Sequence, residues 1–98
     1  MDRLTVHALK GTQRRVVVLQ YPGLDTGSTL LVAPLYPAED GLVLATVTPK
    51  VRLDDEDFLI AMHLLAAVPK QELGPAEASL AAEEYPIANA LNRLFFGI

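Results

Sequence analysis

The chain has 98 residues and a formal net charge of −4, with 51% hydrophobic residues and no cysteine. This length favours one domain over residues 1–98 with a single modest core. The composition is that of a folded globular protein, and the lack of cysteine excludes disulfide bonds and thiolate catalysis. No apolar run reaches the ~18 residues of a membrane span. The first residues form no apolar signal core, so we expect a cytoplasmic protein.

Charge is distributed unevenly along the sequence. Residues 1–21 carry four basic residues and one acidic residue, whereas the remainder carries four basic and eleven acidic residues. The sequence pI is near 4.9. A net-negative chain lacks the broad basic surface that binds nucleic acid. We therefore expect no direct binding to DNA or RNA.

The first third of the chain predicts β-strands. Apolar and polar residues alternate over 3–8, which is the period of a half-buried strand. A turn at Lys10–Gln13 and a stretch rich in β-branched residues at Arg14–Tyr21 complete a predicted hairpin. A third strand is predicted over Thr29–Leu35. Pro34 has no N–H to donate, so that end should lie at a sheet edge or beside a bulge.

The middle of the chain gives weaker signals. A short strand is predicted over Leu42–Val47, with pairing resumed at Lys50–Leu53 and an acidic turn at Asp54–Asp57. The apolar run Phe58–Val68 has the length and the Leu, Ala and Met content of a helix, but it follows several strands. We interpret it as a buried strand, because an antiparallel sheet here needs a central partner. Gln71–Ala78 contains Gly-Pro and is predicted to be irregular.

The last part of the sequence predicts an amphipathic helix that begins near Ala82 and holds Pro86 in its first turn. Phe96 projects about 180° away from Ile87 on this helix, among polar residues. It is either an exposed aromatic residue tolerated at a fraying end, or part of a contact tip formed by Phe96, Gly97 and Ile98. The apolar residues with helical spacing, which should form the buried stripe, are Ile87, Ala90, Leu91, Leu94, Phe95 and Ile98.

No pattern in the sequence indicates catalysis, a metal site or a cofactor. His63 lies in the middle of an apolar run and is interpreted as a hydrogen-bonded core histidine, and His7 has no partner at a metal-ligand spacing. The acidic run Asp54–Asp57 lacks the glycine and the spaced ligands of a calcium loop. Neither serine lies in a nucleophile-elbow sequence, and no glycine-rich phosphate loop is present. We therefore expect a protein that is not an enzyme and holds no cofactor or metal.

The sequence LNRLFFGI at residues 91–98 resembles the ending of the CcdB family, the gyrase-poisoning toxins of toxin–antitoxin pairs. The similarity extends along the chain. Residues Leu24–Gly27 resemble the first long loop of the family, Val32–Leu35 its Val-x-Pro-Leu strand, and Ala66–Pro69 its Ala-x-Val-Pro strand end. The spacing between these blocks is kept over nearly the whole chain. The last five residues are the most specific part.

The resemblance implies a mainly β fold with one C-terminal α-helix, namely an SH3-like barrel of the CcdB/MazF type with an antiparallel sheet and a small second sheet. It implies a homodimer that binds the DNA gyrase A subunit through the helix tip and traps the cleaved-DNA complex. It also implies a cognate antitoxin with a disordered tail. By position, the gyrase-binding residues are Phe96, Gly97 and Ile98. The family more commonly has tryptophan where this chain has Phe96, which keeps an aromatic face but has less area and no indole N–H.

Two other functions stay open from the sequence. One is a ribonuclease toxin of the MazF type, which shares this barrel. The low pI and the absence of an obvious basic groove argue against it. The other is a non-toxic binding module that has kept the fold. Gyrase-dependent linearisation of a supercoiled plasmid would separate these functions from a gyrase poison.

Overall fold

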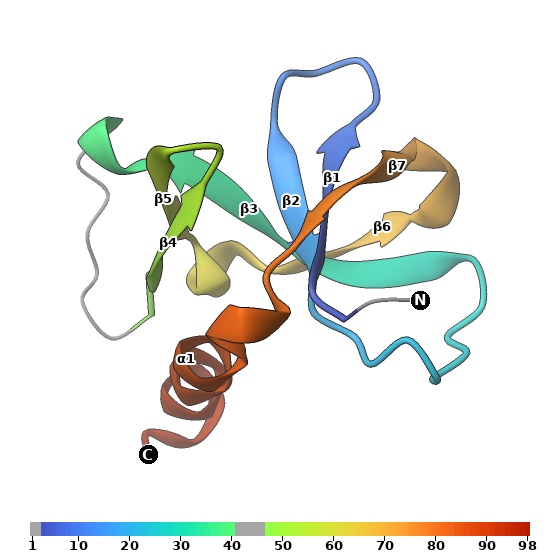
Figure 1. Cartoon of the computed structure of the whole chain (residues 1–98). Coiled ribbons are helices and arrows are strands. Elements are labelled where there is room, and N and C mark those ends of the chain that lie inside the picture. Colours follow the sequence, from blue (N-terminus) through green and yellow to red (C-terminus); the bar gives the residue numbers. More distant parts are fainter. Residues whose placement is uncertain (1–2, 41–46) are drawn as a thin grey trace.

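The computed structural model describes residues 3–40 and 47–98, which fold into a strongly curled antiparallel sheet with one helix at the C-terminal end (Figure 1). Within these residues the sheet has seven strands in the order β4-β5-β3-β2-β1-β7, and β6 pairs with β3 as well. This half-barrel with helix α1 (Glu84–Phe96) confirms the predicted fold class. The strands are β1 (Thr5–Leu9), β2 (Arg15–Val18), β3 (Thr29–Pro37), β4 (Lys50–Leu53), β5 (Glu56–Ile60), β6 (Ala66–Pro69) and β7 (Leu73–Ser79).

The predicted first hairpin is confirmed. Val6 of β1 lies opposite Val17 of β2, and both side chains are fully buried. Gly11 in the connecting turn has a φ of 80°, a conformation that glycine adopts without steric cost. Strand β2 ends at Val18 rather than at Tyr21. One further backbone bond, from Leu19 N–H to the Leu31 carbonyl, extends the pairing with β3.

Strand β3 is the centre of the sheet, and Pro34 marks the place where it changes partner. One edge of β3 pairs with β2, whereas the other pairs first with β6 and then with β5. Residues 29–32 face β6 and residues 35–37 face β5, so Pro34 falls between the two partners. The proline thus lies at a break in the ladder rather than on an outer strand.

The prediction of one continuous strand over Phe58–Val68 is wrong. If the β3–β5 ladder continued from Leu35 opposite Ile60, Val32 would lie opposite residue 63, but it lies opposite Ala66, so the chain contains three extra residues. The Ala61 N–H donates to the Pro34 carbonyl at 2.9 Å, and Pro34 has no N–H to return the bond. The chain therefore leaves the ladder and forms a short 3₁₀ helix over residues 62–64 before β6 begins.

His63 lies in this 3₁₀ helix and not in a strand. It is half-buried, and its buried Nδ1 makes no hydrogen bond within the described residues. The interpretation of His63 as a hydrogen-bonded core histidine is therefore wrong for this ring nitrogen. The three extra residues explain the error, because they take the segment out of the sheet.

The prediction of irregular structure over Gln71–Ala78 is also wrong, because most of this segment forms β7. Strand β7 pairs with β1 from Thr5 opposite Ser79 to Leu9 opposite Leu73, with two register shifts. The residues Gly74 and Pro75 fall within the second shift. Strand β7 is an outer strand, so one of its edges has no neighbouring strand. A proline on that edge leaves no neighbouring carbonyl without an N–H donor.

The strands β4 and β5 form a tight hairpin that extends from the main sheet through the end of β3, and it takes the place of the expected small second sheet. Its two turn residues, Asp54 and Asp55, have φ angles of 54° and 63°. Two successive positive φ angles are typical of a type I′ turn. Glu56 and Asp57 belong to β5 and not to the turn. The strand predicted over Leu42–Val47 lies outside the described residues, except for Val47.

Two apolar clusters stabilise this arrangement on opposite sides of the sheet. The smaller cluster consists of Val16, Val18 and Val32 with half-buried neighbours from β1, β3, β6 and β7. The larger cluster is made of Leu4, Val6, Val17, Ala33, Leu35, Val51, Leu53, Phe58, Ile60, Met62, Leu80, Ile87 and Ala90.

No helix of the described part is long and apolar enough to cross a membrane.

Candidate partner-binding tip of the C-terminal helix

The N-terminal end of α1 is fixed to the body of the protein. A 3₁₀ turn over residues 81–83 leads into the helix, and the preceding Leu80 is buried in the larger core cluster. The Arg3 guanidinium forms an ion pair with Glu84 at the first turn. The hydrogen bond to Glu84 and its charge raise the pKa of Arg3. The helix begins at Glu84, two residues later than predicted, and Pro86 lies in its first turn, as predicted, where its missing N–H breaks no helical hydrogen bond.

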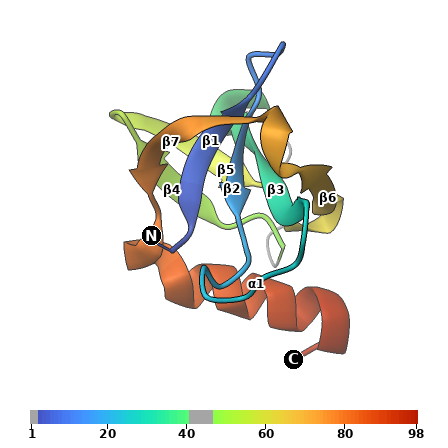
Figure 2. The same cartoon turned by 90° about the vertical axis from the view of Figure 1, so that its right-hand side faces the viewer.

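The first two turns of α1 pack against the core. Ile87 and Ala90 are each only 2% exposed, and Leu91 packs on the same cluster. Leu94, one turn later, is half-buried. Figure 1 shows the helix extending from the end of β7 toward the C-terminus, and in Figure 2 it crosses below the sheet. Burial along the helix decreases from Ile87 and Ala90 to Leu94.

In the single chain, the prediction of a buried apolar stripe on α1 is wrong for the last two residues of the stripe. Phe95 is 59% exposed and Ile98 is 82% exposed, although their spacing would place them on the buried face. Helical periodicity identifies residues that share a face, but it does not say how far the neighbouring surface extends. These two side chains lie beyond the part of the helix that the sheet covers.

Phe96 is 73% exposed, and this agrees with its predicted direction away from the packed face. Its ring lies beside that of Phe95, with centroids 6.4 Å apart and an interplanar angle of 54°. A tilted aromatic pair at this separation is favourable. The pair and Ile98 form an apolar tip, which we define as Phe95, Phe96 and Ile98.

Gly97 ends the helix and sets the course of the chain after it. Its φ of 73° and ψ of 12° are left-handed, and its N–H donates to the Arg93 carbonyl at 3.1 Å. This is the αL cap in which glycine is preferred. A Cβ at this position would meet no atom within 4 Å, so the preference for glycine is purely torsional. Gly97 thus sets the direction of the chain between Phe96 and Ile98 through its backbone conformation alone.

The apolar tip has the composition of a surface that contacts another protein. Three pockets of the described residues are lined by other residues than Phe95, Phe96 and Ile98. The described residues contain no group of three His, Cys, Asp or Glu side chains that could hold a metal ion. Protruding aromatic residues are the side chains most often found at the energetic centre of protein interfaces.

Sequence reasoning missed two exposed aromatic residues on this helix. Phe95 was assigned to the buried stripe, and Tyr85 in the first turn, which is 80% exposed, was not considered. A signal for Phe95 was present. Leu94, Phe95 and Phe96 are consecutive, and a helix rotates by about 100° per residue, so three large apolar neighbours cannot all face one core.

A comparison with models of protein families agrees with the fold. The family model described as CcdB protein matches residues 3–97 of this chain of 98 residues. The match includes every strand, the whole of α1 and Gly97. It confirms the resemblance noted from the sequence.

Proposed function

The chain belongs to the CcdB family, whose members are toxins of toxin–antitoxin systems, and on this basis we propose that it poisons DNA gyrase through the tip of α1. In this proposal Phe96, Gly97 and Ile98 contact the gyrase A subunit while DNA is cleaved, and the bound toxin prevents religation. The chain itself carries out no chemical step.

The observation that carries the proposal is the position of Phe96. Its ring is 73% exposed, although the aromatic side chain would gain from burial if the body of the protein offered a site for it. The αL cap at Gly97 holds the end of the helix in a defined geometry next to this ring. An exposed aromatic residue at a fixed helix end is a suitable anchor for a pocket on a partner.

We further propose that the functional unit is a symmetric homodimer of single-domain subunits, each comprising residues 1–98. Phe95 is a large apolar side chain left exposed beside the core-facing stripe, and it is not one of the residues proposed to contact gyrase. A two-fold arrangement would bring identical surfaces together. A cognate antitoxin with a disordered tail and a cytoplasmic location complete the proposal. Light scattering at micromolar concentration should give about twice the 10.6 kDa mass of one chain, and a monomer would contradict the dimer.

The test of gyrase poisoning is a cleavage assay with purified gyrase and supercoiled plasmid. The native chain should increase the amount of gyrase-dependent linear DNA. Phe96→Ala should weaken the effect by about 30-fold or more in required concentration, which corresponds to about 2 kcal/mol for an interface anchor. Phe96→Trp should preserve or strengthen the effect, because it increases the area of the aromatic face.

Tyr85→Ala is the matched control, because Tyr85 is an equally exposed aromatic residue at the other end of the same helix. It should leave the cleavage assay unchanged. A native chain that never produces linear DNA would refute gyrase poisoning. An equal loss for Tyr85→Ala and Phe96→Ala would show that the contact is not made by the tip.

A further inference from the structure

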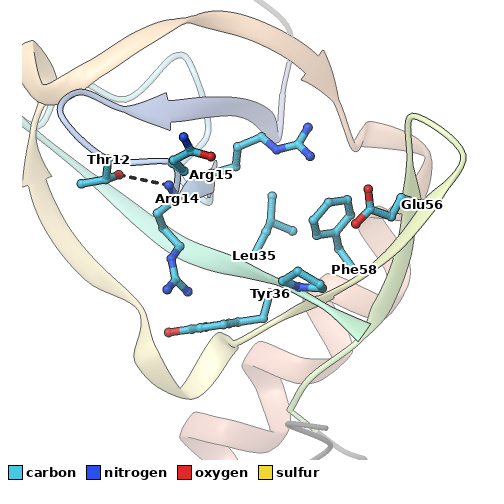
Figure 3. Close-up of a pocket in the computed structure, with 9 residues that line it drawn as sticks. Thr12, Arg14, Arg15, Leu35, Tyr36, Glu56 and Phe58 are labelled. Atoms are coloured by element: carbon cyan, nitrogen blue, oxygen red, sulfur yellow. Dashed lines mark hydrogen bonds between the residues drawn. The ribbon is translucent and has the colours of Figure 1, made fainter. Parts of the chain in front are cut away.

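A second candidate site lies far from the apolar tip, in a cavity of about 440 Å³ between the β1–β2 turn, the end of β3 and the start of β5. This volume falls within the usual range for ligand sites, about 300–1,000 Å³. None of the lining residues belongs to α1. Figure 3 shows the side chains of Arg14 and Arg15 diverging from the start of β2, Arg14 over the ring of Tyr36 and Arg15 toward Phe58.

The charge of Arg15 is already compensated. Its Nη1 lies 3.3 Å from Asp54 Oδ2 and 3.8 Å from Glu77 Oε1. The guanidinium also lies over the ring of Phe58, 4.8 Å from the centroid. Arg15 therefore holds the β4–β5 hairpin against the sheet and has little need of an added anion.

Arg14, in contrast, forms no ion pair with any carboxylate whose side chain the structure describes, which are those of residues 3–39 and 47–98. Its guanidinium stacks over the ring of Tyr36, 4.0 Å from the centroid, which fixes the plane of the group (Figure 3). Its Nη1 is buried and makes no hydrogen bond in the described part of the chain. A guanidinium held in one plane by an aromatic ring presents its N–H groups in a fixed fork that matches a planar oxyanion.

The charges around the cavity favour a single carboxylate over a polyanion. Glu56 lines the cavity, and Asp54 and Glu77 lie at Arg15, so a nucleic-acid strand or another multiply charged ligand would be repelled. Leu35, Pro37 and Phe58 supply apolar lining in the same cavity. We propose that this cavity binds the carboxylate of a glutamate or aspartate side chain in a peptide segment, with Arg14 as the anchor and an adjacent apolar side chain against the lining.

The proposal goes beyond gyrase poisoning and is tested separately from it, because the cavity and the tip share no residue. The probe is the blocked dipeptide acetyl-Leu-Glu-amide, titrated into the ¹⁵N-labelled native chain at constant ionic strength. The backbone amide signals of Arg14, Arg15 and Tyr36 should shift in a saturable manner at millimolar peptide. The isosteric acetyl-Leu-Gln-amide should bind at least tenfold more weakly, because it lacks the charge that Arg14 recognises.

Variants assign the contact to one residue. Arg14→Gln should weaken binding of the glutamate peptide at least tenfold, and Arg14→Lys should retain part of it, because lysine keeps the charge but loses the planar fork. The matched control is Arg52→Gln. Arg52 is an exposed arginine on β4 that bonds to Asp57 and does not line the cavity. This control should bind like the native chain.

Three results would overturn the proposal. Equal affinity for the glutamate and glutamine peptides, measured on the native chain, would exclude recognition of the carboxylate even if no variant folds. Native affinity in Arg14→Gln would exclude Arg14 as the anchor. Inorganic phosphate that displaces the peptide at equal concentration would show a general anion site rather than a peptide site.

Discussion

The helix α1 contains one residue that holds the fold together and another that should not matter for folding, and this contrast can be measured. Ile87 is 2% exposed and belongs to the larger core cluster. Ile87→Ala removes three buried carbon atoms, about 2.4 kcal/mol of transfer free energy at ~0.8 kcal/mol each. A residual cavity adds to this loss, so we expect destabilisation of about 3–4 kcal/mol. Phe96→Ala should cost less than ~0.5 kcal/mol, because the ring is 73% exposed.

Urea denaturation at one fixed protein concentration measures both changes, since the stability of a dimer would depend on concentration. A slope near ~1 kcal/mol per molar urea turns the loss in Ile87→Ala into a midpoint lowered by about 3–4 M. Leu94→Ala is the intermediate case. Leu94 is half-buried rather than central in the stripe, so we expect a loss of about 1–2 kcal/mol. If Phe96→Ala lowers the midpoint as much as Ile87→Ala does, Phe96 is a core residue and the tip does not exist as described.

Three further predictions concern the turn and the helix end. Asp55→Gly should raise the free energy of unfolding, measured by urea denaturation, by about 0.5–1 kcal/mol, because Asp55 has a φ of 63° that glycine adopts more easily. A lower free energy of unfolding in this variant would contradict the positive φ. Gly97→Ala should lower the free energy of unfolding by about 1 kcal/mol, because residue 97 has a left-handed φ of 73°, and it should also reduce the gyrase-dependent linear DNA. Native stability together with native activity would show that the cap has no role. Deletion of Phe96–Ile98 should cost about 0–2 kcal/mol and leave the circular-dichroism spectrum unchanged, and a deleted chain that fails to fold would make the tail structural.

The sequence was a good guide where local signals and tertiary contacts agree. Alternating residues and a glycine turn predicted the β1–β2 hairpin, and the structure places Val6 opposite Val17 in it. The helix at the end of the chain was predicted from its 3.6-residue period, with Pro86 in its first turn. The direction of Phe96 followed from the same period. In each case the determining interactions lie within a few residues along the chain.

The segments that were predicted wrongly depend on contacts with distant residues. The run Phe58–Val68 has no local break, but Pro34, far away in the sequence, cannot return a hydrogen bond, and the run divides into β5, a 3₁₀ turn and β6. Strand β7 contains Gly74 and Pro75, and it becomes a strand only because β1 offers an outer edge that tolerates two register shifts. Pairing partners decided these elements, and one segment does not reveal its partner.

The apolar tip shows the same division between sequence and structure. The sequence by itself determined that Phe96 points away from Ile87, because helical geometry sets the angle between them. Only the tertiary structure decided that Phe95 and Ile98 are exposed as well, since that depends on which surface of the chain covers each turn of the helix. The contrast between Arg15, which pairs with Asp54, and Arg14, which stacks on Tyr36, is likewise invisible in the sequence. Periodicity fixes directions around an element, whereas burial and charge pairing depend on which distant surface that element meets.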